Sequence, residues 1–247
     1  MPTLSVIIIT KNEAGSIRPT LEAVQSADEI IVLDSGSTDS TPEICREFTP
    51  HVFITDWPGF GMQKNRALAK ASSDWVLTID ADERVPPALM QEIKQVITTD
   101  TATAYAVRRL STYCGKLIKY GAWRNDYKTI LFKRGKAEFS NSLVHERVIV
   151  EGELSKLNEP LLHETYTDLS EVIDKYNSYS SYGAEERLKQ GKQGGLGKAL
   201  WHGFWTFFRG YILQLGFLDG KEGFMLAVSN AEGSYYRYLK LMYLRSR

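Results

Sequence analysis

Residues 74–83 read Asp-Trp-Val-Leu-Thr-Ile-Asp-Ala-Asp-Glu, an apolar run that ends in two aspartates separated by one alanine. The apolar part, 75–79, has the length and composition of a buried strand. Asp80 and Asp82 follow where this strand ends. A hard divalent cation is typically held by one or two carboxylates, with phosphate oxygens completing its shell. The stretch therefore predicts a buried strand with a candidate metal site at its carboxyl end; a loop cap of solvated acids is the alternative.

Short apolar runs alternate with helical patterns over the first hundred residues. Strands are expected at 4–10, 29–34, 52–55 and 75–79, and helices at 17–24, from 41, at 61–70 and at 87–97. This alternation predicts βαβ units and a mostly parallel sheet flanked by helices, an α/β fold. Ligands of such sheets bind beyond the carboxyl ends of the strands. Three strands end there in Thr10-Lys11-Asn12-Glu13, Asp34 and Asp80-Ala81-Asp82, so we expect carboxylates to gather along one edge.

Two further segments add polar groups to this edge. Asp34 precedes Ser-Gly-Ser at 35–37, where the glycine permits a tight turn whose N–H groups can meet an anion or a base. Asp34 is a candidate for hydrogen bonds to a nucleobase or ribose, and an Asx turn is the alternative. Gln-Lys-Asn-Arg at 63–66 opens a helix facing the same edge. Lys64 or Arg66 is therefore a candidate for a phosphate or ribose, unless this is a solvated helix face.

Beyond residue 100 the pattern is less regular, and the chain ends in a smaller helical part. Strands are expected at 104–109, 127–133 and 148–150, with Trp123 and His145-Glu146 on loops. Asp-Leu-Ser-Glu at 168–171 is a capping box that opens a helix through about 190, and a break is expected at 192–195. We predict an α/β domain at 1–165 and a helical extension at 166–247.

The C-terminal extension is basic and aromatic. Residues 187–247 contain ten Lys and Arg against three Asp and Glu, whereas the remainder has 20 against 27. This indicates a surface that meets anions, either phospholipid headgroups or nucleic acid. Residues 199–218 contain seven aromatic residues, but the central Arg209 makes a membrane span unfavourable. We expect a helix lying in the membrane interface and no nucleic-acid partner; a helical pair covering the core is the alternative.

Composition sets the class and the compartment. The chain has 247 residues, 43% of them hydrophobic and 24% charged, which excludes a disordered chain and suits one domain with an extension. Cys45 and Cys114 form no disulfide framework, so a reducing compartment is expected. The N-terminus lacks a basic region followed by a long apolar run. We expect a cytoplasmic protein, held peripherally on the inner face of the cytoplasmic membrane.

Four motifs, in order and at suitable spacing, together resemble family 2 glycosyltransferases of the GT-A fold. They are Ser-Val-Ile-Ile-Ile-Thr-Lys-Asn-Glu at 5–13, Asp-Ser-Gly-Ser-Thr-Asp at 34–39, Lys-Asn-Arg at 64–66 and the stretch at 74–83. Later pieces, His145-Glu146 and Gly-Phe-Leu-Asp-Gly at 216–220 with Gly223-Phe224, resemble the branch that glucosylates the inner core of bacterial lipopolysaccharide. The resemblance covers essentially the whole chain.

The resemblance implies a nucleotide-sugar site formed by Thr10, Asn12, Glu13, Asp34, Lys64 and Asp80. Within it, Glu13 and Asp34 would hold the uridine, and Asp80 would lie near the ribose or the diphosphate. Asp82 would bind Mg²⁺ or Mn²⁺, which bridges the diphosphate and stabilises the charge on departing UDP. His163 follows an apolar pair and is a candidate further ligand, since imidazole suits Mn²⁺ better than Mg²⁺. His145 competes with it for this role.

Transfer with inversion needs a general base that takes the proton of the acceptor hydroxyl. Glu146 is the candidate by the resemblance, although the local pattern is His-Glu where family members more commonly have Glu-Asp. A surface ion pair with Arg147 or Lys133 is the alternative for Glu146. Trp123 and Arg124 are candidates for the acceptor wall, because Trp stacks on sugar rings and Arg pairs with phosphate; a hairpin tip with a core Trp is the alternative. His145 is a further acceptor candidate.

The expected reaction is transfer of a hexose, glucose by the resemblance, from a UDP-sugar to a saccharide on a lipid. Two other classes compete with it. A sugar-phosphate nucleotidyltransferase would carry a Gly-rich, Arg-containing loop after the first strand, where this chain has Thr10-Lys11-Asn12-Glu13. A non-catalytic nucleotide-binding scaffold would have no need of Asp80, Asp82 and a candidate base.

Overall fold

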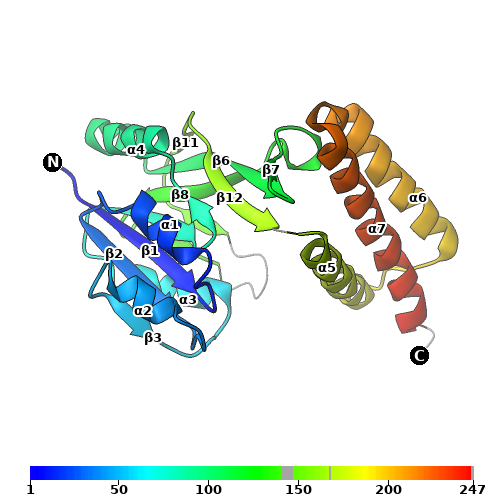
Figure 1. Ribbon diagram of the computed structural model, residues 1–247, viewed down its shortest axis with the longest axis horizontal. Helices are drawn as coiled ribbons and strands as arrows, with labels where there is room; N and C mark the ends of the chain where they lie inside the picture. The colour runs from blue at the N-terminus through cyan, green and yellow to red at the C-terminus, as the bar shows by residue number, and fades with distance from the viewer. Residues whose placement is uncertain (141–146, 167, 246–247) are drawn as a thin grey trace. The chain divides into compact units, whose positions relative to one another are not determined.

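The computed structural model describes residues 1–140, 147–166 and 168–245. The chain divides into two compact units, each built from two segments. The first unit comprises Met1–Arg109 and Asp126–His163, and the second comprises Leu110–Asn125 and Glu164–Arg247. Figure 1 labels the elements of both units.

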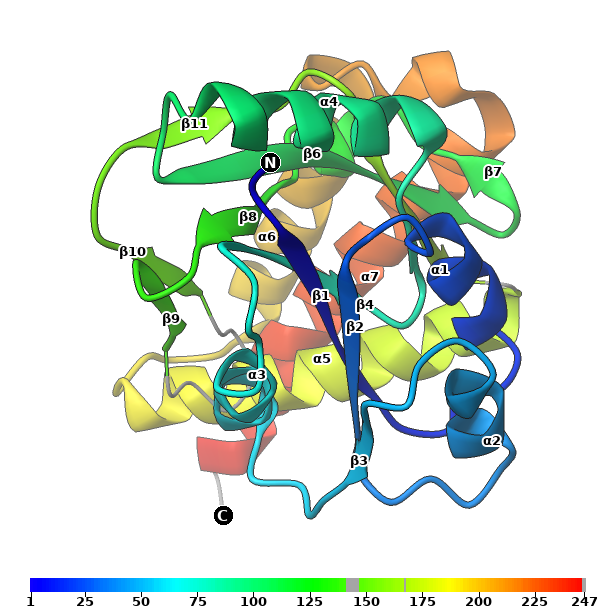
Figure 2. The ribbon, with the colours of Figure 1, turned by 90° about the vertical axis from the view of Figure 1, so that its left-hand side faces the viewer.

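Four parallel strands form the start of the sheet in the first unit. They lie in the order β3 (Val52–Ile54), β2 (Glu29–Asp34), β1 (Leu4–Thr10) and β4 (Trp75–Asp80). Figure 2 shows β1 between β2 and β4. The register pairs Thr10 with Asp34 and Ile9 with Asp80, so the carboxyl ends of β1, β2 and β4 meet at one edge. The predicted strands and the gathering of their polar ends are confirmed.

Helices cover both faces of these strands because β1 is buried at every position and apolar without a break from Val6 to Ile9. Val6 and Ile8 belong to a core with α1 (Ile17–Ala23), α2 (Thr41–Arg46) and α4 (Pro87–Thr99). Ile7 and Ile9 belong to a second core with α3 (Phe60–Leu68). Alternate side chains of a strand face opposite sides of a sheet, so an uninterrupted apolar run requires a layer on each side.

Beyond β4 the sheet is mixed, which corrects the prediction of a mostly parallel sheet. Its order continues β8 (Tyr127–Lys133), β6 (Ala104–Tyr113), β12 (Leu161–Tyr166) and β5 (Glu83–Arg84). β8 pairs antiparallel with both β4 and β6. The connection from β6 to β8 has only a short strand, β7 (Lys116–Leu117), and a 3₁₀ turn, η1 (Gly121–Trp123), whereas a parallel pair needs a long crossover. β11 (Leu154–Lys156) also pairs with β6, and β9 (Ala137–Phe139) pairs with β10 (Val148–Val150).

The second unit is mainly helical. Its helices are α5 (Leu169–Lys189), α6 (Leu196–Phe208) and α7 (Gly220–Arg245), and both α5 and α6 pack on α7. The predicted cap is confirmed, since the Asp168 carboxylate accepts a hydrogen bond of 2.9 Å from the Glu171 N–H. The predicted helix at 199–218 ends earlier: α6 passes into a π-helical turn, η2 (Arg209–Leu213), and a 3₁₀ turn, η3 (Gly216–Asp219). Within the described residues, no helix has the length and hydrophobicity needed to cross a bilayer.

The segment 110–125 packs with these helices. Tyr113 and Ile118 are buried with Tyr166, Val172 and Leu226, and the Tyr113 hydroxyl lies 2.8 Å from the Ser229 hydroxyl. The buried Asp219 carboxylate accepts hydrogen bonds from the N–H groups of Lys119, at 3.2 Å, and Tyr120, at 2.8 Å. The segment 110–125, which we call the hairpin, and the helices of the second unit therefore share one core.

Candidate active site

The loops that follow β1 and β2 are bonded to each other. The Asp34 carboxylate is fully buried and accepts hydrogen bonds from the N–H groups of Gly36, at 3.0 Å, and Ser37, at 2.8 Å, and from the Ser37 hydroxyl. The Ser37 oxygen accepts a hydrogen bond of 2.8 Å from the Asn12 N–H, and the Asn12 amide oxygen accepts one of 2.8 Å from the Thr38 N–H. Asp34 thus forms the Asx turn that was its alternative role, and this turn orders the edge of the sheet.

Thr10 and Glu13 lie on the same loop. The Glu13 N–H donates to the Thr41 hydroxyl at 2.8 Å, and the Glu13 carboxylate accepts a hydrogen bond from the Ser16 hydroxyl. The Thr10 hydroxyl is buried and finds no hydrogen-bond partner among the residues that the structure describes. A buried hydroxyl is normally paired, so this oxygen is a candidate for a ligand contact.

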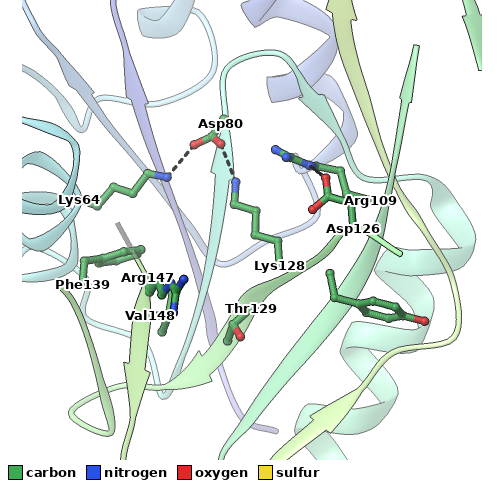
Figure 3. Close-up of a pocket in the computed structure, with 10 residues that line it drawn as sticks. Lys64, Asp80, Arg109, Asp126, Lys128, Thr129, Phe139, Arg147 and Val148 are labelled. Carbon is green, nitrogen blue, oxygen red and sulfur yellow. Dashed lines mark hydrogen bonds and ion pairs between the residues drawn. The ribbon is translucent and has the colours of Figure 1, made fainter. Parts of the chain in front are cut away.

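Asp80 is held between two lysines (Figure 3). Its Oδ1 lies 2.9 Å from the Lys64 ammonium, which is almost completely buried, and its Oδ2 lies 2.5 Å from the Lys128 ammonium. Burial opposes ionisation of Asp80, but Lys128 and Lys64 outweigh it and hold the pKa of this carboxyl well below its usual range. Asp80 is therefore a carboxylate at neutral pH, and Lys64, predicted as a phosphate contact, reaches this edge as its partner.

The ion pairs continue from Asp80 through buried groups. Lys128 also lies 2.9 Å from the Glu83 carboxylate, which is completely buried. Arg109 lies 3.4 Å from Glu83 and 2.8 Å from Asp126. Charges of opposite sign therefore alternate in a row of six side chains, which we call the charged row: Lys64, Asp80, Lys128, Glu83, Arg109 and Asp126. The sequence motifs gave no role to Lys128 or Arg109, and Glu83 entered only as the last residue of the stretch at 74–83.

A cavity of about 630 Å³ opens beside the charged row. Four cationic side chains line it: Lys64, Lys128, Arg109 and Arg147. Among the described residues, two carboxylates, Asp80 and Asp126, line it with them, so cationic side chains outnumber carboxylates in the described lining. The remaining lining residues are Tyr127, Thr129, Phe139 and Val148. Such a cavity suits an anion that also carries a ring or an apolar face.

Helix α3 brings Lys64 to this cavity, and the other residues of its Gln-Lys-Asn-Arg run anchor the helix. Gln63 donates to the Ser35 hydroxyl at 3.0 Å and to the Thr55 hydroxyl at 2.7 Å. Asn65 donates to the Phe139 carbonyl and accepts from the Phe139 N–H, which holds β9 against the helix. Arg66 pairs with Asp56 at 2.8 Å on the surface.

Asp82 follows Asp80 by two residues, and its side chain faces His163. The Asp82 Oδ2 lies 3.2 Å from the His163 Nε2, in line with the pairing of Glu83 and His163 between β5 and β12. Burial raises the pKa of Asp82, and the hydrogen bond from His163 more than offsets this, so the pKa is lowered. Within the described residues there is no group of three or more His, Cys, Asp or Glu side chains around a common point. The pair fits a cation that takes two protein ligands and completes its shell with phosphate or water.

The remaining predicted residues are His145, Glu146, Trp123 and Arg124. His145 and Glu146 lie outside the described residues. Trp123 and Arg124 belong to the second unit, where Trp123 stacks on Tyr166 with ring centroids 6.0 Å apart. Among the described residues, neither Trp123 nor Arg124 lines the cavity of the first unit.

The sequence matches the family model "Glycosyl transferase family 2" over residues 5–148, more than half of the chain. The chain belongs to this family. The family match includes the β1 loop, the β2 turn, α3 and the charged row, and it confirms the resemblance stated from the motifs.

Relatives of the family 2 chain match over nearly its full length. An uncharacterized glycosyltransferase of Rickettsia felis is 31% identical, with 99% of this chain and 90% of the relative covered. The lipopolysaccharide core biosynthesis glycosyltransferase LpsC of Rhizobium meliloti is 30% identical, with 96% and 89% covered. The crystal structure of S. aureus TarS 1–349 has a TM-score of 0.51 at 15% identity, covering 99% of this chain and 92% of that one. This structural likeness supports the GT-A-like α/β fold.

Proposed function

We propose that this glycosyltransferase moves a hexose, glucose in the first instance, from a UDP-sugar to a saccharide carried on a lipid, with inversion at the sugar. The observation that carries the proposal is the cavity lined by cationic side chains and by Asp80, which ends β4 two residues before Asp82 of the Asp82–His163 pair. A nucleoside diphosphate is an anion with rings, so both the charge and the chemistry of this lining suit it.

The donor would be held by side chains of the first unit. In the proposal, Glu13 and Asp34 hold the uridine, with Thr10 and Asn12 beside them. The buried, unsatisfied Thr10 hydroxyl supports this among the described residues, since a ligand atom would satisfy it. Asp34 already accepts three hydrogen bonds from its own turn, so its part is mainly to hold that turn in shape.

Asp82 and His163 are the residues that would hold Mg²⁺ or Mn²⁺. When bound, such an ion acts as a Lewis acid toward the departing diphosphate. Lys64, Lys128 and Arg109 line the cavity and are held in place by their partner carboxylates, so they can donate hydrogen bonds to the negative charge that develops on the leaving group. Asp80 has both oxygens bonded to lysines, so we propose that it positions these cations near the ribose or diphosphate.

On the acceptor side, Glu146 remains the proposed general base, which would take the proton of the attacking hydroxyl. Trp123 and Arg124 remain the proposed acceptor wall, and His145 a second candidate for either metal or acceptor. The similarity to LpsC supports a saccharide of the lipopolysaccharide core as the acceptor. Such an acceptor would place the enzyme peripherally at the inner face of the cytoplasmic membrane, without a nucleic-acid partner. We propose that residues 1–165 carry the transfer chemistry and 166–247 the membrane contact.

The change Asp82→Asn tests the metal role. It keeps the shape of the side chain but removes a hard anionic ligand, so we expect Mn²⁺-dependent UDP binding to weaken and hydrolysis or transfer of UDP-glucose to be lost. Calorimetric titration of UDP with and without Mn²⁺ measures the first, and release of UDP measures the second. Asp56→Asn, which changes an exposed aspartate paired with Arg66, is the matched control and should behave like the unchanged protein. Full activity of Asp82→Asn would contradict the proposal.

A further inference from the structure

Helix α6 exposes its large apolar side chains. Leu196, Leu200, Trp201, Phe204 and Trp205 are all exposed, and Trp201 and Phe204 each keep 60% of their surface accessible. Leu196, Leu200 and Phe204 are four residues apart, as are Trp201 and Trp205, so the five side chains lie along one side of the helix. Trp201 stacks on Trp205, with ring centroids 6.3 Å apart, so the exposed side is a continuous aromatic surface.

The opposite side of α6 carries small residues. Ala199 and Gly203 are buried in α6, and a Cβ atom on Gly203 would lie 3.3 Å from the Cβ of Tyr235 in α7. Helices α6 and α7 lie side by side in Figure 1. A helix of a water-soluble domain normally turns its large apolar residues toward the core and its polar residues outward. The exposed side of α6 does the reverse, so packing within the second unit does not account for Trp201, Phe204 and Trp205.

The apolar surface continues past the end of α6. The π-helical turn η2 and the 3₁₀ turn η3 expose Ile212, Leu213, Leu215, Phe217 and Leu218. Leu215 adopts a left-handed backbone conformation with φ of 62°, which is unusual for a large side chain. We call the exposed apolar residues of α6, η2 and η3 the apolar surface.

The charges on this segment are all positive. Residues 191–218 contain no Asp or Glu, and their charged residues are Lys192, Lys198 and Arg209, each of them exposed. Cations without acidic neighbours favour contact with an anionic surface. Two copies of the chain meeting through this face would instead bring like charges together.

We infer that the apolar surface of α6, η2 and η3 is a membrane-docking surface, which inserts its aromatic side chains at the headgroup level of an anionic phospholipid bilayer. Amphipathic helices that lie in the interface have this combination of Trp and Phe with cationic residues. The inference deepens the proposed function, on which it rests, by naming the bilayer that carries the acceptor as the partner of this surface.

Co-sedimentation with vesicles tests the inference. The full-length protein should sediment with vesicles of equimolar phosphatidylglycerol and phosphatidylcholine, and less with vesicles of phosphatidylcholine alone. Added salt should weaken the binding without abolishing it, because screening removes the electrostatic part only. The tryptophan emission should shift to the blue on binding. Absence of sedimentation of the unchanged protein would overturn the inference.

A triple variant, Leu200→Ser, Trp201→Ser and Phe204→Ser, locates the contact. All three side chains are exposed, so the fold should be kept, and circular dichroism checks this. We expect its vesicle partition coefficient to fall at least tenfold. The matched control, Trp57→Ser with Tyr182→Ser, changes exposed aromatic residues outside the apolar surface and should bind as before. Equal binding of the triple variant and the control would overturn the inference, as would a dimer that the triple variant converts to a monomer.

A second readout separates this inference from the proposed function. Mn²⁺-dependent UDP binding is measured on the same proteins in the absence of vesicles. Loss of vesicle binding with UDP binding intact in the triple variant supports the docking surface. If the unchanged protein binds vesicles but not UDP, the proposed donor fails while the docking surface stands.

Discussion

Lys128 joins two carboxylates that would otherwise share a poorly solvated space. Asp80 and Glu83 both lie within 3.0 Å of its ammonium. Lys128 offsets the repulsion between these two carboxylates, and it does so from β8, a strand that pairs antiparallel with β4.

The change Lys128→Met tests this role in stability. Among the ion pairs of the charged row, Glu83 would keep the one with Arg109, at 3.4 Å. Breaking a buried ion pair from one side is costly, and we expect the free energy of unfolding to fall by about 3 kcal/mol. Urea denaturation followed by circular dichroism measures the change.

The matched control for that variant is Arg18→Met. Arg18 pairs with Glu47 at 2.7 Å, but both side chains are about half exposed. An exposed pair contributes about 0–1 kcal/mol, so this variant should be nearly neutral. If both variants lose the same free energy of unfolding, burial does not determine how much the ion pairs of the charged row contribute to stability.

Some members of the charged row could be predicted from the sequence, and others could not. Asp80 and Lys64 were predicted at the sheet edge because each follows or opens an element recognisable from its own pattern. Lys128, Glu83 and Arg109 were missed because their roles depend on the antiparallel pairing of β8 with β4 and β6. Nothing in the local pattern of 127–133 distinguishes an inserted antiparallel strand from a parallel one.

Two glycines allow the close approach of elements in the tail. A Cβ atom on Gly223 would lie 2.0 Å from the Gly216 carbonyl oxygen and 2.9 Å from the Cβ of Asp219. The first obstacle is backbone and cannot rotate away. This explains in physical terms why the sequence has glycine at 216 and 223 around Asp219.

We expect Gly223→Ala to destabilise the second unit by about 1–3 kcal/mol, toward the upper end, because an added methyl group must displace the backbone. Thermal unfolding monitored by circular dichroism measures the loss. Gly197→Ala is the matched control, since a Cβ atom there meets nothing within 4 Å. In a helix that change should be neutral or stabilising by up to about 1 kcal/mol. Equal losses in the two variants would show that close packing at Gly223 is not the cause.

Elements with strong local signals were predicted well. The strands β1, β2 and β4 and the start of α5 match their sequence patterns closely, since an apolar run or a capping box is sufficient to define each. The end of α6 was not predicted. Residues 199–218 keep a helical composition throughout. The π and 3₁₀ turns bring Gly216 against Gly210, so closely that a Cβ atom on Gly216 would lie 2.7 Å from the Gly210 oxygen. This contact between residues of two turns cannot be read from local composition.

At the scale of the whole molecule, the chain enters the second unit twice. The segment Leu110–Asn125 packs with the helices of Glu164–Arg247, which no local pattern indicated because the contacts join residues about a hundred positions apart. Fold class follows from the alternation of elements, whereas this grouping depends on tertiary contacts alone.

A chain that ends after His163 should therefore lose order in 110–125 while keeping β1. The N–H groups of Lys119 and Tyr120 donate to Asp219, which this truncation removes, so their hydrogen exchange should become fast. Exchange measured by mass spectrometry on peptides from 4–10 provides the internal control. If the amides of 119–120 stayed protected from hydrogen exchange in the truncated chain, the assignment of 110–125 to the second unit would be contradicted.

The two-segment core also bears on how the protein is made. Tyr113 leaves the ribosome 116 residues before Ser229, the partner of its hydroxyl. At a synthesis rate of about 5–20 residues per second, this hairpin waits on the order of ten seconds for the helices that cover it. During that interval its apolar side chains are open to solvent and to other nascent chains. Slower translation of the tail would lengthen this exposure, so the yield of folded protein should depend on elongation rate and on chaperones that shield the hairpin until α7 arrives.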